Sequence, residues 1–161
     1  MHDSIFSKTF LNSEQKIIPY DGSPLSWRVS VYALVRKGNE VLIIKGKQEK
    51  MYDITGGGVN LGEDLEQALS RECMEEAGAT IKIGHLLSTE FEWFYHKSGK
   101  YYQTVELFYE GKLVGELQDP TDENIEWRGF VPISDIGTKY IVRPIVAALI
   151  LKNQDSKQQL Q

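Results

Sequence analysis

The segment from Leu65 to Ala77 constrains the fold most strongly, because helix signals are complete at both of its ends. Asp64 is a favourable N-cap residue, and Gln67, three residues later, completes the reciprocal capping-box pattern. Gly78 fits the left-handed position just past the end of a helix. Helical spacing also predicts one core-facing stripe, formed by Leu65, Ala68, Leu69, Cys73 and Ala77.

Three glutamates of this helix lie on the side of its apolar stripe. At 3.6 residues per turn, Glu72 lies nearly in line with Leu65, and Glu76 lies between the directions of Leu65 and Leu69. Glu75 borders the same side. Partly buried carboxylates at this spacing repel one another unless cations compensate their charge, and Mg²⁺ and Mn²⁺ prefer such oxygen ligands. The spacing therefore favours a metal site over solvated surface glutamates.

The rest of the pattern predicts strands and one further helix. Residues 27–36 alternate between apolar and polar side chains, as in a strand with one buried face, and 37–39 form a tight turn into a strand at 41–44. A C-terminal helix is expected at 143–152, with Pro144 in its first turn. Further strands are expected at 81–87, 89–95, 102–110 and 125–130, with a turn at 96–100. This order predicts an α+β fold in which helices pack on a mixed β-sheet.

The length of 161 residues favours a single domain, which we expect to span 25–153. Residues 1–24 are irregular and end in a cluster of turn formers. They are compatible with an extra strand, with an arm that packs on a partner subunit of a homodimer, or with a loose tail. Residues 154–161 are expected to form a polar tail.

Charge and cysteine content narrow the partners and the compartment. The net charge of -5 provides no broad cationic field for a nucleic acid polymer or an acidic membrane. Cys73 is the only cysteine, so a disulfide within the chain is excluded and a reducing, cytoplasmic compartment is expected. The longest apolar stretch, 145–151, is too short to span a bilayer, and residues 1–12 lack a signal-peptide pattern.

Together with the preceding glycines, the acidic helix resembles the Nudix box. The family pattern is Gly, five residues, Glu, seven residues, and then Arg-Glu-(aliphatic)-any-Glu-Glu-any-Gly-(aliphatic). The chain has Gly57 and Glu63 at the first two fixed positions and continues at the required distance with Arg71-Glu72-Cys73-Met74-Glu75-Glu76-Ala77-Gly78-Ala79. Cys73 and Ala79 replace the usual larger aliphatics, and Thr55 stands where a proline commonly precedes the glycines.

The resemblance implies an α/β/α sandwich and a Mg²⁺-dependent hydrolase, with Mn²⁺ as an alternative metal. Such hydrolases cleave a phosphoanhydride bond in a nucleoside diphosphate linked to another group X, so the expected partner is a nucleotide-type small molecule. A MutT-like nucleoside triphosphate pyrophosphatase is the default within the family. The alternatives are a dinucleoside polyphosphate hydrolase and a non-catalytic Nudix domain that senses nucleotides. Isomerisation of an allylic diphosphate, a reaction of a related family, has little support.

The resemblance also implies a role for each position of the box. Glu72 and Glu76 would be the principal metal ligands, with Glu75 as a further ligand or as the general base. The carbonyl of Gly56 would complete the inner shell of the metal. The bound metal would bridge phosphate oxygens and lower the pKa of an attacking water.

Two further residues of the box would position these groups. Glu63 would hold the glycine loop or a metal-bound water, and Arg71 would orient the glutamates, with Glu75 in reach at i+4. The general base has two candidate sources, Glu75 and an acidic loop before the strand at 125. The acids of that loop, which otherwise form a solvated surface, are Glu116, Asp119, Asp122 and Glu123.

One predicted hairpin is rich in aromatic residues. Strand propensity and core packing are the favoured explanation, and stacking on a nucleobase is the alternative. The basic residues of its turn, His96, Lys97 and Lys100, would touch terminal phosphates or lie exposed. Tyr95 falls where relatives that cleave dinucleoside polyphosphates carry a tyrosine. The aromatic residues are Phe91, Trp93, Phe94, Tyr95, Tyr101 and Tyr102.

Overall fold

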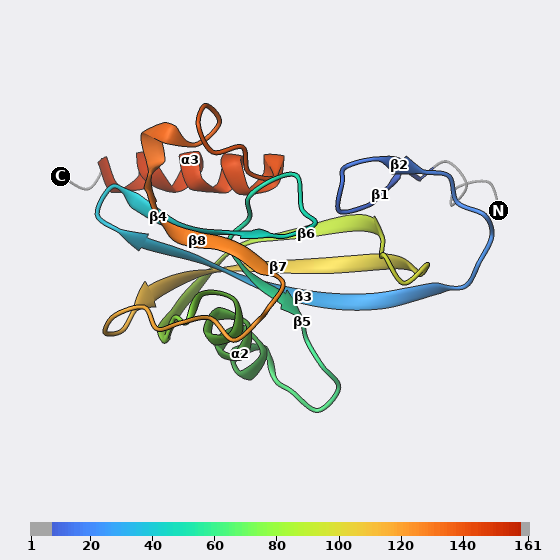
Figure 1. Cartoon of the computed structure of the whole chain (residues 1–161), viewed down its shortest axis with the longest axis horizontal. Coiled ribbons are helices and arrows are strands. Elements are labelled where there is room, and N and C mark those ends of the chain that lie inside the picture. The colour runs from blue at the N-terminus through green and yellow to red at the C-terminus, as the bar shows by residue number, and fades with distance from the viewer. Residues whose placement is uncertain (1–7, 159–161) are drawn as a thin grey trace.

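The computed structural model describes residues 8–158, which form one mixed sheet with helices on its faces. The strand order is β2-β1-β6-β7-β3-β4-β8, and β5 pairs with β3 beside this path (Figure 1). The strands are β1 (Phe10–Leu11), β2 (Ile17–Ile18), β3 (Leu25–Lys37), β4 (Glu40–Gly46), β5 (Thr55–Gly58), β6 (Ile81–Tyr95), β7 (Tyr101–Leu113) and β8 (Ile125–Pro132). The helical elements are α2 (Leu65–Ala77), the short 3-10 helix η1 (Ile133–Asp135) and α3 (Pro144–Gln158).

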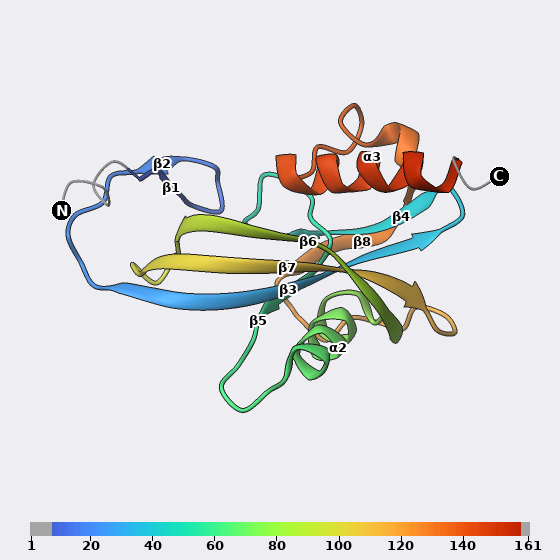
Figure 2. The same cartoon turned by 180° about the vertical axis from the view of Figure 1, so that it is seen from behind.

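Helices α2 and α3 cover opposite faces of this sheet (Figure 1, Figure 2). Residues of β3 alternate between the two sides, because successive side chains of a strand point in opposite directions. Val31 and Ala33 pack in the core cluster that contains Leu69 of α2, whereas Leu34 packs in the cluster that contains Val146 of α3. Burial of a side chain such as Leu69 contributes roughly 1.5–3 kcal/mol. The predicted α/β/α sandwich with a mixed sheet is confirmed.

Strand β6 is continuous from Ile81 to Tyr95, where the sequence predicted two strands at 81–87 and 89–95. Its pairing with β7 shifts register between Ile83 and Leu86 and again between Leu86 and Ser88. A β-bulge of this kind interrupts the alternation of side chains without ending the strand. The prediction of two separate strands was therefore wrong.

Helix α3 begins at Pro144, one residue after the predicted start, and continues to Gln158, past the predicted end at 152. Lys and Gln have good helix propensity, so the polar composition of this last segment does not end the helix. Neither α2 nor α3 is long and apolar enough to cross a membrane over the residues that the structure describes.

Residues 8–24 form a small hairpin that adds to the edge of the sheet (Figure 1). Strand β1 pairs antiparallel with β2 and parallel with β6, where Leu11 lies opposite Phe94. Of the three alternatives for the N-terminal segment, the described part adopts the extra strand. Residues 1–7 and 159–161 lie outside the described residues.

Candidate active site

Helix α2 has the caps that its sequence predicts. The Asp64 carboxylate accepts from the Gln67 N–H at 2.8 Å, and the Gln67 side chain accepts from the Asp64 N–H at 2.9 Å. Gly78 ends the helix at φ 61°, where a Cβ would collide with the carbonyl oxygen of Gln118. Ala68, Leu69, Cys73 and Ala77 are buried as expected, but Leu65 is only partly buried because it lies in the first turn, at the edge of the core.

The Arg71 guanidinium contacts three carboxylates at the acidic helix. Its Nε lies 2.6 Å from Glu63 Oε1 and its Nη2 lies 3.0 Å from Glu63 Oε2. Its Nη1 donates to Glu72 at 2.8 Å and to Glu75 at 3.1 Å, while Nη2 also donates to the carbonyl of Gly58 at 3.0 Å. The bonds from Arg71 to Glu63, together with the Asn60 N–H, lower the pKa of the Glu63 carboxyl to about 2. One guanidinium thus orients the glutamates and ties the helix to the glycine strand.

Glu72 and Glu76 are packed against the glycines of β5. A Cβ on Gly57 would lie 2.6 Å from Glu72 Oε1, so only glycine leaves room for this carboxylate. The Gly56 N–H donates to Glu76 Oε2 at 2.9 Å. Gly56 itself has φ 154°, and a Cβ there would collide with the main chain of β3, including Tyr32 Cα at 2.6 Å. The glycines therefore bring the main chain directly against both acids.

The surroundings of Glu76 disfavour the ionised form of its carboxyl group. Burial raises the pKa of its carboxyl well above the usual range, the Gly56 N–H bond lowers it, and Glu72, Asp53 and Asp122 raise it further. Among the side chains described, those of residues 8–153, no Lys or Arg forms an ion pair with Glu76. A cation beside Glu76 and Glu72 would offset this unfavourable electrostatic energy.

The carboxylates do not form a closed metal shell. Among the described residues, no three side chains of His, Cys, Asp or Glu lie close enough together to hold a metal ion. Glu75 is 43% exposed and turns toward Arg71, whereas Glu72 is 14% exposed. Mg²⁺ commonly keeps several waters and uses only one or two carboxylates together with substrate phosphates. Glu72 and Glu76 suit such an open site.

Thr55 and Cys73, two of the departures from the family pattern, contact each other. Thr55 is fully buried at the start of β5, and its Oγ1 lies 3.2 Å from Cys73 Sγ. Burial raises the pKa of the Cys73 thiol to about 12. Thr55 thus fastens the glycine strand to helix α2 in the core.

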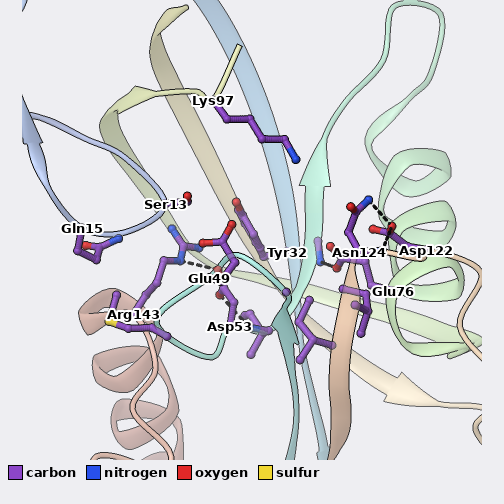
Figure 3. A pocket seen from close by; sticks show the side chains of 16 residues that line it. Ser13, Gln15, Tyr32, Glu49, Asp53, Glu76, Lys97, Asp122, Asn124 and Arg143 are labelled. Carbon is purple, nitrogen blue, oxygen red and sulfur yellow. Dashed lines mark hydrogen bonds and ion pairs between the residues drawn. The ribbon is translucent and has the colours of Figure 1, made fainter. Parts of the chain in front are cut away.

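A cavity of about 310 Å³ opens beside Glu76 (Figure 3). Glu76, Asp122 and Asn124 lie along one side of it, and Arg143 and Asp53 lie toward the other. The further lining residues include Ser13, Gln15, Tyr32, Glu49 and Lys97. Glu76 joins α2 to this cavity, so a molecule bound there lies next to the acidic helix.

Arg143 is a buried cation that the sequence pattern did not single out. Its Nε lies 2.6 Å from Asp53 Oδ2, and its Nη1 lies 3.2 Å from both carboxylate oxygens of Glu106 and 3.5 Å from Glu92. Its guanidinium also stacks over the ring of Tyr32 at 4.9 Å. These partners lie far apart along the chain, so no local pattern could have indicated the cluster.

The acidic loop before β8 contributes one residue to the cavity. Asp122 lines it, whereas Glu116, Asp119 and Glu123 do not. The loop docks on the end of α2, because the N–H groups of Thr121 and Asp122 both donate to the Glu75 carbonyl at 2.9 Å.

Some residues of the aromatic hairpin pack against other aromatic rings, and others line the cavities. Tyr101 and Trp93 pack on Phe10 of the N-terminal hairpin, and Tyr95 packs on Tyr101 with ring centroids 4.8 Å apart. Phe94 lines a second cavity of about 230 Å³ that adjoins the first. The other members are Phe91, which is 67% exposed, and Tyr102, which lies beside Arg28. Of the basic turn residues, His96 lines the second cavity and Lys97 the first, while Lys100 lines neither.

The sheet between two helices and the contacts between acidic helix α2 and the glycines of β5 can be compared with known families. The NUDIX domain model matches residues 26–150. The chain therefore belongs to the Nudix family, and the resemblance seen in the box is confirmed.

Relatives agree with this assignment. The chain is 31% identical over 80 residues to the mitochondrial Nudix hydrolase 17 of Arabidopsis thaliana, covering 50% of this chain and 43% of that protein. It is 37% identical over 62 residues to an ADP-ribose pyrophosphatase of Methanocaldococcus jannaschii, covering 37% of each. Each match spans less than half of the relative. A NUDIX hydrolase structure from Nitrosomonas europaea has a TM-score of 0.68 at 20% identity, covering 82% of this chain and 91% of that one, and it supports the fold.

Proposed function

We propose that this chain is a hydrolase that uses Mg²⁺, or alternatively Mn²⁺, to cleave a phosphoanhydride bond in a nucleoside diphosphate linked to another group X. The main observation in support of the proposal is the environment of the Glu76 carboxyl group. Its carboxyl group is partly buried beside Glu72, accepts from the Gly56 N–H, and borders a cavity of about 310 Å³. Family membership supports the same chemistry.

Glu72 and Glu76 are the proposed metal ligands, with Glu75 and the Gly56 carbonyl completing the set as phosphate and water bind. When bound, the metal supplies charge neutralisation at the phosphates and a water of lowered pKa. Arg71 keeps Glu72 and Glu75 in fixed orientations through bonds of 2.8 and 3.1 Å. Glu63 acts through Arg71 and also accepts from the Asn60 N–H at 3.0 Å, which holds the loop before α2.

The proposed general base is Glu75, with Asp122 as the second candidate. Glu75 belongs to the box and retains an exposed carboxylate beside Arg71. Asp122 has the advantage that it lines the cavity, which Glu75 does not. Substitution by the neutral amide separates them, because loss of the base lowers kcat strongly and loss of a bystander does not. We expect Glu75→Gln to lower kcat at least 100-fold and Asp122→Asn to lower it less than tenfold.

A MutT-like nucleoside triphosphate pyrophosphatase is the proposed type. Lys97 extends toward the cavity (Figure 3) and gives the phosphates a positive partner. Carboxylates of Asp53, Glu49 and Glu92 surround the Arg143 end, which disfavours phosphate there. The similarity to an ADP-ribose pyrophosphatase makes ADP-ribose the second candidate substrate. The remaining alternatives are dinucleoside polyphosphates and nucleotide sensing without turnover.

The test is a substrate panel with product identification. Nucleoside triphosphates, dinucleoside polyphosphates, ADP-ribose and nucleotide sugars are incubated with the chain and Mg²⁺ or Mn²⁺, and the products identify the phosphorus that is attacked. Glu76→Gln should abolish turnover with the fold retained. Glu66→Gln is the matched control, because Glu66 lies exposed in the first turn of the same helix. Full activity of Glu76→Gln with Mg²⁺ would exclude the metal-ligand role. Nucleotide binding without hydrolysis would favour the sensor.

A further inference from the structure

The N-terminal hairpin supplies part of the cavity wall, although it precedes the segment matched by the family model, residues 26–150. Its turn between β1 and β2 brings Ser13 and Gln15 to both the 310 Å³ cavity and the adjoining 230 Å³ cavity. In Figure 3 these two residues lie on the loop that faces the cavity from the side opposite Glu76. The hairpin therefore lines the space that the acidic helix borders.

Aromatic packing fixes the hairpin in place. Phe10 is fully buried and packs against Tyr20, Trp93 and Tyr101, with ring centroids 4.9–5.6 Å apart. The Tyr101 hydroxyl donates to the carbonyl of Pro19 at 2.8 Å. Because this aromatic packing and the hydrogen bond hold the hairpin against the sheet, the hairpin forms a fixed wall of the cavity.

Gln15 holds an unfavourable backbone conformation inside a well-bonded turn. It has φ 60° and is the one non-glycine residue with positive φ in the part of the chain that the structure describes. The Asn12 side chain accepts from the N–H groups of Glu14 and Lys16 at 3.0 and 2.9 Å, and the Gln15 N–H donates to the Asn12 carbonyl at 2.8 Å. Glycine would adopt this conformation without strain, so the glutamine side chain needs another reason to be there.

The second cavity combines neutral hydrogen-bonding groups and an aromatic ring with charged side chains that include Arg28 and Arg143. Thr104 is 3% exposed, lines the second cavity, and its Oγ1 has no hydrogen-bond partner. Phe94 of β6 lines the same cavity with apolar surface, as does Leu11 of the hairpin itself. Glu92 adds a carboxylate that accepts hydrogen bonds and repels phosphate. A flat, uncharged ring with donors and acceptors on its edge fits this combination.

We propose that the N-terminal hairpin is the specificity wall of the substrate site, where Ser13 and Gln15 hydrogen bond the nucleobase and Phe94 contacts its face. The inference rests on the proposed function, because it assumes that the substrate phosphates lie beside Glu76. The base then extends from the first cavity into the second, away from the acidic helix.

Replacement of Gln15 by glycine tests this role. Gln15→Gly removes the amide and relieves the strain at φ 60°, so the melting temperature should stay the same or rise. KM for the best of ATP, GTP, CTP and UTP should rise roughly tenfold with Mg²⁺ present, because a hydrogen bond to the substrate is lost. The KM for inorganic tripolyphosphate, which has no nucleobase, should change less than twofold. Ser13→Ala should act in the same direction.

The matched control is Lys16→Ala, an exposed position of the same turn that lines neither cavity, and its KM values should be unchanged. An unchanged nucleotide KM in both Gln15→Gly and Ser13→Ala would overturn the proposal, as would an equal rise with tripolyphosphate. If the unaltered chain hydrolyses no nucleotide, the proposed function fails by itself. Binding of the four free nucleosides, measured by saturation-transfer NMR without metal, then decides. Weaker nucleoside binding by Gln15→Gly supports recognition of the nucleobase by the hairpin, and no binding or equal binding overturns it.

Discussion

The Arg71 guanidinium contacts both carboxylate oxygens of Glu63, with Nε 2.6 Å from Oε1 and Nη2 3.0 Å from Oε2. These two contacts join the loop before helix α2 to the middle of that helix. The same guanidinium reaches Glu72 and Glu75. Because these contacts use the planar fork of arginine, they set the direction of the acids as well as their charge. Orientation, charge and packing at this site can therefore be separated by substitution.

Arg71→Lys keeps the positive charge but loses the two-point contact with Glu63. We expect kcat to fall about 100-fold, since small misplacements of reacting groups have effects of that size. Stability should change by less than about 1 kcal/mol, because the Arg71 side chain is 26% exposed and partly exposed ion pairs contribute little. Steady-state kinetics and urea unfolding measure the two effects. Wild-type kcat in this variant would refute the orienting role.

Glu63 gives the stability of the fold a defined pH dependence. Arg71 lowers the pKa of its carboxyl from 4.5 to about 2, so the ionised form favours the folded state. This contribution is fully present above 4.5 and is lost as the pH falls toward about 2. The difference in melting temperature between the unaltered chain and Glu63→Gln should therefore shrink over that interval. A difference that stays constant with pH would contradict the prediction.

Replacing two glycines of the box by alanine should affect activity in one case and stability in the other. The Cβ of Gly57→Ala meets the flexible end of Glu72, so the carboxylate moves and activity falls at least tenfold with little loss of stability. The Cβ of Gly78→Ala meets the main-chain carbonyl of Gln118 at a residue with φ 61°, so stability falls by more than about 1 kcal/mol. Parallel assays of turnover and thermal unfolding distinguish the two variants.

Loss of the Arg143 guanidinium leaves the buried carboxylate of Glu106 and the partly buried carboxylate of Asp53 without their counter-ion. We expect Arg143→Met to destabilise the fold by about 3–5 kcal/mol in urea unfolding. Adding Glu106→Gln should restore part of that loss, because one of the two uncompensated charges is removed. Strictly additive effects of the two substitutions would mean that the 3.2 Å contacts contribute no coupling.

Short-range sequence patterns specify helix α2 and the order of the acids along it. Its cap residues Asp64, Gln67 and Gly78 act through neighbouring main-chain groups, so the predicted limits of 65 and 77 agree with the structure. Helical periodicity likewise placed Cys73 in the core. These features depend on contacts within a few residues, which a linear pattern records directly.

Tertiary structure alone decided what the acidic helix faces. Arg143 meets Asp53, Glu92 and Glu106 only because the segment just before α3 lies against Tyr52 and beside β6 and β7, and the sequence separation of these residues hides the cluster. Packing of Phe10 on Trp93 and Tyr101 likewise decided that residues 8–24 form an extra strand whose turn lines the cavity. Contacts between distant segments depend on how whole elements bury their apolar faces, and local propensity and spacing do not specify that arrangement.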